Sequence, residues 1–301
     1  MNYFMSLDPL ALFRSMPGAF AQGMVWGLMA LGVYITYRLL DFADLTVDGS
    51  LATGGAVAVM LIRGGMSPWA ALIFAFLAGM VAGFITGILH TALGIPGILA
   101  SILTQISLYS INLNIMGCSN QAVSVDKYPL VVSLRYLSDS NSTRVQIFAT
   151  CILFCFAIVA ILYWYFGTEQ GSALRATGSN PAMSRAQGIN IDRMKVIGLA
   201  LSNGVVALSG GLMTQFQGTA DVNMGRGAIV IGLASIVIGE VFCEAIFKKG
   251  CNFSVKLLFI VLGGVLYYMV MTLILWLRLD PNDLKLFTAL IVALFLAVPY
   301  L

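Results

Sequence analysis

The sequence predicts an all-α polytopic membrane protein with about eight or nine transmembrane helices, each near the length that spans a bilayer. Of its 301 residues, 59% are hydrophobic and only 10% are charged, and its mean hydropathy is +0.94. Soluble domains carry about 25% charged residues. The chain also holds 31 glycines, which allow membrane helices to approach one another closely. These observations indicate a tightly packed bundle of membrane helices.

Apolar segments bounded by polar turns follow one another along the chain. We expect helices over residues 17–40, 49–62, 68–93, 96–116, 145–166, 195–216, 228–247, 253–277 and 284–300. The second segment is short and rich in glycine, and a turn that carries aspartates precedes it. It is therefore either a full span or a discontinuous, partly re-entrant one. The stretch before residue 17 lacks a basic region and a cleavage site, so we expect a mature lead-in.

One long polar and basic run, residues 167–195, interrupts the apolar pattern. Its excess of lysine and arginine predicts the cytoplasmic side of the membrane. Helix-forming residues at 173–176 and 181–187 predict short helices at the membrane surface. The 117–144 loop then lies on the extracytoplasmic side, as a solvated connector or as a docking surface for an external partner. The C-terminus is inside, and the side of the N-terminus depends on whether 41–62 crosses.

The sequence contains no common motif of an enzyme or a nucleotide-binding protein, since G-x-x-x-x-G-K-[ST], H-E-x-x-H and G-x-S-x-G are absent. The net charge of +3 reflects the loops rather than a basic patch for nucleic acid. The single histidine, His90, is expected to be a satisfied side chain at the interface. The cysteines are expected to be packing residues, neither a metal site nor a disulfide framework. They are Cys118, Cys151, Cys155, Cys243 and Cys251.

Acidic residues and a glycine-rich helix start meet in residues 41–56, beside a membrane span. Acidic side chains inside a membrane are costly and are often functional. Asp48 followed by Gly49 and Ser50 is also typical of a helix N-terminus, where such side chains accept backbone N–H bonds. Two roles therefore stay open, contact with the substrate or a gate and helix capping. The candidates are Asp44, Thr46, Asp48 and Ser50.

The segment 96–116 is unusually polar for a membrane helix. Several polar residues recur at helical spacing on one face, which Leu108 interrupts. Polar side chains are costly against lipid, so this face should contact water or other helices. It predicts either the lining of a translocation pathway or interhelical hydrogen bonds. The residues are Ser101, Thr104, Gln105 and Asn112.

Charged and small residues give two further patterns. Glu240, Glu244 and Lys248 have the spacing and the order that favour ion pairs along a helix. They predict a salt-bridge ladder, with a proton-relay carboxylate at Glu240 as the alternative. Two sets of small residues predict helix-packing faces. These sets are Gly79, Gly83 and Gly87, and Ser202, Gly210 and Gly211.

Three stretches of the chain carry a resemblance to a known family. They are DLTVDGSLATGGAVA at 44–58, ALRATGSNPAMSRAQGINIDRMKV at 173–196, and the stretch 200–240. The first resembles the DLSVGS-type element of ABC importer permeases of the branched-chain amino acid and ribose family. The second resembles the cytoplasmic coupling segment of that family, and the third its next two helices with their loop. The matching residues of the coupling segment are Ala176, Gly178, Asn180, Gly188, Ile189 and Asn190.

The chain departs from the family pattern in places. Met183 stands where the coupling segment usually has an alanine, and VDGS at 47–50 is one residue longer than the usual VGS. Ile238, Gly239 and Glu240 replace a pair of glycines. The pattern is similar to a subgroup of permeases for amino acids, aromatic ones among them.

The resemblance implies that residues 1–301 form a single transmembrane permease domain in a bacterial inner membrane. It implies a homodimer that docks two cytosolic ATPase subunits and receives solute from an extracytoplasmic substrate-binding lipoprotein. The chain itself would bind no cofactor and no metal, because ATP and Mg²⁺ would lie on the partner ATPase. Arginines of the 167–195 segment would form ion pairs with the ATPase. The implied coupling residues are Arg175, Gly178, Asn180, Pro181, Ala182, Arg185 and Gly188.

A pathway of serine, threonine, glutamine and asparagine fits a small polar or zwitterionic solute. We expect an amino acid first, and a sugar or nucleoside second. An ion-coupled secondary carrier that uses Glu240 is the alternative from another class. A membrane enzyme is disfavoured, because the sequence lacks a metal or nucleophile cluster.

Overall fold

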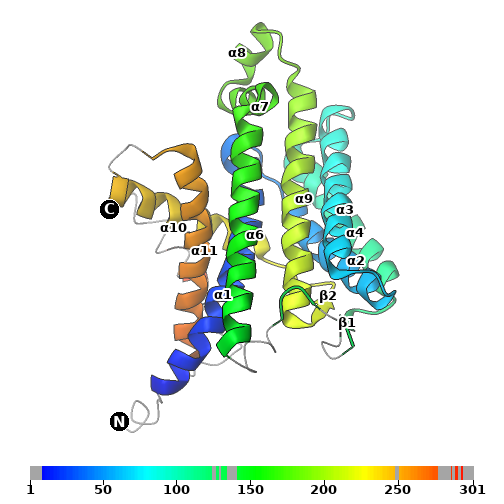
Figure 1. The fold of residues 1–301 in the computed structure, drawn as a ribbon. Helices are drawn as coiled ribbons and strands as arrows, with labels where there is room; N and C mark the ends of the chain where they lie inside the picture. The colour runs from blue at the N-terminus through cyan, green and yellow to red at the C-terminus, as the bar shows by residue number, and fades with distance from the viewer. Residues whose placement is uncertain are drawn as a thin grey trace.

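The computed structural model describes residues 9–123, 127–128, 130–133, 141–247, 251–276, 286, 289, 290 and 293. These residues form a bundle of long helices (Figure 1). A two-stranded ribbon lies at one end of the bundle, and two short helices lie at the opposite end. Among the described residues, seven helices are long and apolar enough to cross a membrane. The predicted all-α polytopic fold is therefore confirmed.

The helices follow the predicted apolar segments closely. The first half of the chain holds α1 (Pro9–Tyr34), the short π-helix η2 (Ile35–Leu39), α2 (Thr46–Arg63), α3 (Pro68–Thr91), α4 (Gly97–Met116) and β1 (Asn120–Ala122). The second half holds α6 (Asn141–Gly167), α7 (Glu169–Ser179), α8 (Pro181–Ala186), α9 (Ile191–Gln217), β2 (Thr219–Asp221), α10 (Ala228–Phe247) and α11 (Phe253–Trp276). The last predicted segment, 284–300, lies mostly outside the described residues.

Two helices form the centre of the bundle. In α1 and α9 the most apolar windows are 83% and 78% buried, whereas those of α4 and α6 are each 28% buried. Helices α2 and α3 both pack along α9. The exposed faces of α4 and α6 consist mainly of isoleucine, leucine and aromatic side chains, as expected for surfaces that meet lipid or another protein.

Helix α2 does not run the full length of the bundle. Ser50, in its first turns, bonds to Asn203, which lies near the middle of α9. From there α2 runs toward the ribbon end of α9, where Gly55 packs against the side chain of Thr214. A helix that begins beside the middle of α9 favours the discontinuous prediction for this segment. The chain between η2 and α2 enters the interior of the bundle without helical structure.

Close helix contacts depend on glycine, as the sequence predicted. A Cβ atom at Gly79 or Gly83 would collide with the backbone of α9, at Asn203 and Leu199 respectively. At Gly54 of α2 it would collide with the backbone of Ala207. These glycines let the α2, α3 and α9 backbones touch. In the second predicted set, Ser202 donates to the Gly32 carbonyl at 2.7 Å and joins α9 to α1.

The ribbon was not predicted from the sequence. Strand β1, in the loop after α4, pairs antiparallel with β2, in the loop after α9, and Asn120 is opposite Asp221. The pairing joins the 117–144 loop, predicted to be extracytoplasmic, to the loop after α9. Within the 117–144 loop, residues 124–126, 129 and 134–140 lie outside the described residues.

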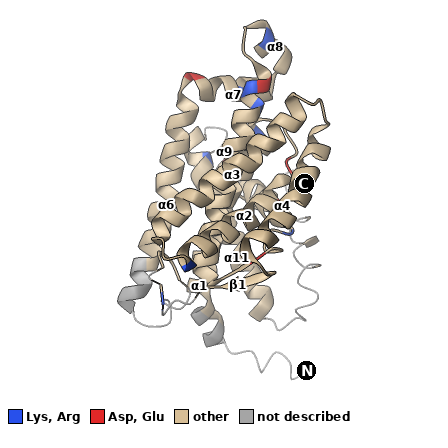
Figure 2. Ribbon diagram, turned by 90° about the vertical axis from the view of Figure 1, so that its right-hand side faces the viewer, with Lys and Arg blue, Asp and Glu red and all other residues tan. Residues whose placement is uncertain are grey.

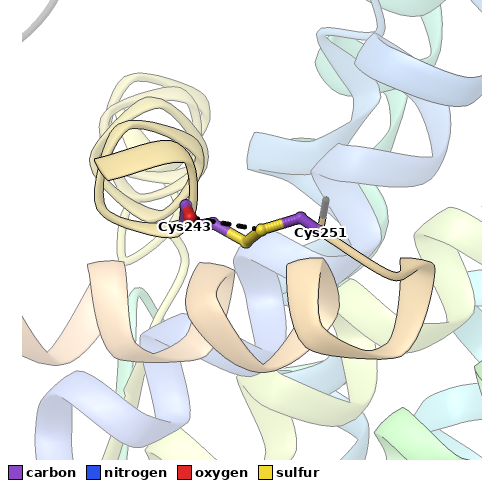
Figure 3. The surroundings of a disulfide bond; sticks show 2 residues. All are labelled: Cys243 and Cys251. Atoms are coloured by element: carbon purple, nitrogen blue, oxygen red, sulfur yellow. Dashed lines mark hydrogen bonds between the residues drawn. A yellow bond between two sulfur atoms is a disulfide. The ribbon is translucent and has the colours of Figure 1, made fainter. Parts of the chain in front are cut away.

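The prediction that all cysteines are packing residues is wrong for one pair. Cys243, in α10, and Cys251, just before α11, form a disulfide (Figure 3). Their eight-residue separation matches no familiar paired spacing, so no pattern in the sequence indicated the disulfide. Cys151 and Cys155 are free and buried, as packing residues should be, and Cys118 is free and exposed.

Candidate functional site

A buried polar network holds the start of α2. The Asp44 carboxylate, 2% exposed, accepts a hydrogen bond from the Thr46 backbone N–H at 2.9 Å and another from the Asn203 Nδ2 at 2.7 Å. Ser50 donates to the Asn203 Oδ1 at 2.6 Å. Asp44 thus satisfies the first backbone N–H of α2 and fastens the helix to α9. For Asp44 and Ser50 the geometry favours the structural alternative over contact with solute.

A chain of threonine hydroxyls lies beside this network. The Thr86 hydroxyl, in α3, lies 2.9 Å from those of Thr46 in α2 and Thr104 in α4. Ser101 donates to the carbonyl of Ile98 in its own helix at 2.8 Å. Thr46, Thr104 and Ser101 are all buried. The threonine hydroxyls join three helices, as the interhelical alternative predicted. The hydroxyl of Ser101 is satisfied within its own helix.

Asp48 lies in α2, but its carboxylate caps the start of another helix, α10. Its two carboxylate oxygens accept the backbone N–H groups of Gly227 and Ile229, each at 3.1 Å. These groups lie at the start of α10, whose positive dipole end favours a carboxylate. Gly225 fits because it lets the loop before α10 touch the backbone of Asp48. Helix capping is therefore correct for Asp48, but the helix is α10, far away in the sequence.

The carboxylate of Asp48 also faces an open pocket of about 310 Å³ between the start of α2, the middle of α4 and the loop before α10. Polar, charged and aromatic side chains line most of it. The lining residues are Asp48, Gly49, Gln105, Ile106, Tyr109, Asn112, Val222 and Arg226. Two of the four predicted pathway residues, Gln105 and Asn112, and one predicted gate residue, Asp48, therefore meet at one cavity. Ser101 and Thr104 do not line it.

Asn112 is the unusual member of the pocket. It is 0% exposed, and neither its Nδ2 nor its Oδ1 has a hydrogen-bond partner in the described part of the chain. A buried polar atom without a partner costs about 1–3 kcal/mol. Arg226 and Tyr109 also face the pocket, and no sequence pattern had singled them out. Arg226 belongs to a short loop between a strand and a helix, where a lone arginine carries no periodic signal.

The two short helices predicted in the 167–195 run are present as α7 and α8. They project from the bundle at the end opposite the ribbon, and Figure 2 shows lysine and arginine around them. Asn180 caps α8 by accepting the Met183 backbone N–H at 3.0 Å, and Pro181 begins the helix. Ala182, Arg185 and Gly188 are exposed. Met183 is 57% exposed, so α8 carries an apolar side chain on its surface.

The other two predicted coupling residues connect α7 to the bundle. Gly178 packs against the carbonyl of Leu39, and a Cβ atom there would collide with it. The Arg175 guanidinium lies 5.5 Å from the ring centre of Phe253, at the start of α11, in a cation–π arrangement. Helix α7 is therefore packed against η2 and α11, whereas α8 is free on most of its surface.

Glu240 forms an ion pair with a residue of another helix. Its carboxylate accepts the Arg38 Nε at 3.0 Å, which joins α10 to η2. Glu244 is exposed, and Lys248 lies outside the described residues. The pairing with Arg38 favours a structural role for Glu240.

His90 is satisfied, as predicted. Its Nδ1 lies 2.8 Å from the Ile95 carbonyl, and Lys195 donates to its Nε2 at 3.2 Å. A proton on Nδ1 satisfies both contacts. The described residues contain no group of three or more side chains that could hold a metal ion.

Comparison with known proteins places this geometry in context. A family model described as "Branched-chain amino acid transport system / permease component" matches residues 16–299. A tyrosine transport system permease protein of Clostridioides difficile (strain R20291) is 40% identical over 276 residues, which are 92% of this chain and 88% of that protein. An uncharacterized protein of Rickettsia prowazekii (strain Madrid E) is 34% identical over 276 residues, 91% of this chain and 93% of that protein.

Two more distant matches are a sequence relative and a solved structure. The autoinducer 2 import system permease protein LsrC of Yersinia pestis (strain Pestoides F) is 27% identical over 242 residues, 80% of this chain and 64% of that protein. A chain in the structure "PsaBC from Streptococcus pneumoniae in complex with Fab" matches with a TM-score of 0.51 at 13% identity. The match covers 96% of this chain and 90% of that chain, and it concerns the fold alone.

Proposed function

The chain belongs to the family of branched-chain amino acid transport system permease components, and we propose that it is the membrane subunit of an ATP-driven, binding-protein-dependent importer. The solute in this proposal is an amino acid, in the first place an aromatic one. The chain is a transporter subunit rather than an enzyme. The observation that carries the proposal is the position of α7 and α8, which lie at the end opposite the ribbon (Figure 1) and carry the exposed arginines Arg175 and Arg185.

The energy for transport comes from a partner in this proposal. The sequence contains no phosphate-binding loop, so ATP and Mg²⁺ belong to a separate ATPase. An ATPase has a suitable docking element in α8, where Met183 offers an apolar contact and Arg185 a charged one. Gly178 packs α7 against η2, which directly follows α1, and Asn190 caps the start of α9. Movement of α8 would therefore be passed to α1 and α9, the two central helices. Rigid-body movement of these helices would alternate access to the pathway.

A homodimer in a bacterial inner membrane completes the proposal, with two ATPases inside and a binding lipoprotein outside. Apolar side chains of α4, including Ile106 and Ile111, are exposed beside the pocket. A second copy on this face would enclose the pocket between two subunits. The ribbon end, which the positive-inside rule puts outside, is then the surface that receives the binding protein.

The choice of solute rests on similarity and on the chemistry of the pocket. The 40%-identical relative is named as a tyrosine transport permease, while the 27%-identical relative is named as an autoinducer 2 permease. The higher identity supports an amino acid, and the second similarity keeps a sugar-like solute as the lesser candidate. The ion-coupled alternative is weakened because Glu240 is already paired with Arg38.

Copurification and transport together test this function. We expect the full-length chain, expressed with a candidate ATPase and a candidate binding protein from the same genome, to copurify with the ATPase. In proteoliposomes that complex should accumulate labelled L-tyrosine only when ATP and the binding protein are present. Uptake driven by a proton or sodium gradient without ATP would contradict the proposal, as would a permease active without an ATPase.

A further inference from the structure

The pocket beside α4 carries one negative and one positive side chain, which a passive pathway does not require. Asp48 supplies a carboxylate and Arg226 a guanidinium, and the two charges do not form an ion pair with each other. Arg226 is exposed, and its backbone N–H donates to the carbonyl of Asn223. The pocket therefore offers both an acceptor for a cation and a donor for an anion.

Asn112 gives independent evidence of a missing ligand. The side chain is fully buried, lines the pocket, and has neither a donor nor an acceptor partner in the described part of the chain. Buried amides nearly always find partners, so an orphaned one needs an explanation. A solute with both a donor and an acceptor group would pair both ends of this amide.

Close packing holds these groups in place. A Cβ atom at Gly49 would meet Leu108 and the backbone of Gln105, so α2 lies directly against α4. On its other side, the Asp48 backbone touches Gly225, two residues from the hydrogen-bonded Gly227. The carboxylate is therefore positioned by two helices and a loop, as a binding site requires.

From these features we propose that the pocket is a binding site in the permease itself for a zwitterionic α-amino acid. The α-carboxylate binds Arg226, the α-ammonium group binds Asp48, and Asn112 completes the hydrogen bonds of both. Tyr109, 43% exposed at the rim, offers its ring to a flat side chain. The inference rests on the proposed function, because it names the solute class that the transport pathway selects.

Equilibrium binding to the full-length protein in nanodiscs, without the binding protein, tests the site. The probe is radiolabelled L-tyrosine, and the competitors are tyramine, which lacks the carboxylate, and 3-(4-hydroxyphenyl)propionate, which lacks the ammonium group. We expect saturable binding, with each competitor at least about tenfold weaker than unlabelled L-tyrosine, because each leaves one charge unpaired. Equal competition by all three compounds, or no saturable binding, overturns the inference.

Substitutions locate the site. Arg226→Gln should weaken L-tyrosine binding by about tenfold, whereas the control Arg63→Gln, an exposed arginine outside the pocket, should leave it unchanged. Asn112→Leu should abolish binding without lowering the melting temperature, because leucine keeps the volume and removes the unpaired atoms. Normal binding by both pocket variants overturns the inference.

ATPase copurification and uptake separate this inference from the proposed function. If the unsubstituted complex takes up solute with ATP while the pocket variants bind and transport normally, the importer stands and the pocket is not its selecting site. If the unsubstituted chain neither copurifies with an ATPase nor responds to ATP, the proposed function fails, whatever the pocket binds.

Discussion

Asn203 and Asn112 are both fully buried asparagines, but their surroundings differ. Asn203 bonds to Asp44, Ser50 and the carbonyl of Leu199, whereas Asn112 has no partner in the described structure. The same substitution should therefore have opposite effects at the two positions. Asn203→Leu removes one of the two hydrogen bonds to the buried Asp44 carboxylate and leaves the Ser50 hydroxyl without its acceptor, and should destabilise the protein by about 2–4 kcal/mol.

The matched control is Asn112→Leu, which removes unpaired atoms and should leave stability equal or higher. Thermal unfolding of both variants in the same detergent, followed by tryptophan fluorescence, measures the difference. Equal melting temperatures for the two variants would contradict the network described around Asp44.

Asp48 provides a second test at the level of one side chain. Asp48→Ala removes the acceptor for the Gly227 and Ile229 N–H groups and should cost about 0.5–2 kcal/mol, as loss of a helix cap does. Asp48→Asn keeps one acceptor oxygen and should lose less. The melting temperatures of the two variants rank them, and an alanine variant as stable as the unsubstituted protein would show that the cap is not formed.

Substitutions in α8 should reduce transport without changing the stability of the fold. Met183 and Arg185 are exposed, and substitutions at exposed positions usually change stability by less than about 0.5 kcal/mol. Met183→Glu should therefore leave the melting temperature unchanged and reduce ATP-dependent uptake by at least about tenfold, since it puts a charge into an apolar contact. Gln187→Glu, an exposed change at the end of the same helix, is the control for charge alone.

Helix α7 should transmit movement through its contact with η2. Gly178→Leu places a side chain where the Leu39 carbonyl lies, so α7 must move away from the bundle. We expect the ATPase still to bind α8 while solute uptake per ATP hydrolysed falls. Measured ATPase activity and uptake in the same proteoliposomes give this ratio, and an unchanged ratio would show that α7 does not transmit the movement.

The elements that the sequence predicted well are those set by local chemistry. Hydropathy and length fixed the helices, Asn180 before Pro181 gave a cap, and the glycines of α3 gave a packing face. The features that the sequence did not predict depend on contacts between residues far apart in the chain, such as Asn120 with Asp221 in the ribbon. No spacing rule reports such contacts, because they form only when the bundle has assembled.

The candidate site shows the same limit at the scale of the whole molecule. The polar stripe of α4 predicted four pathway residues, but only Gln105 and Asn112 line the pocket, because the other two turn toward α3 and their own helix. Arg226 and Tyr109 complete the pocket from positions that carry no pattern. The bundle, rather than any single segment, decides which polar residues face the cavity.

In the whole molecule, α8 is the proposed point of energy input, and the pocket toward the ribbon end is the proposed point of solute selection. Site-specific photocrosslinking in native membranes tests this most directly, with a photoreactive phenylalanine analogue at Met183 or at Gln121 in β1. We expect the Met183 probe to crosslink to the ATPase and the Gln121 probe not to. Crosslinking of the ATPase from Gln121, or none from Met183 in a transport-competent complex, would contradict the account.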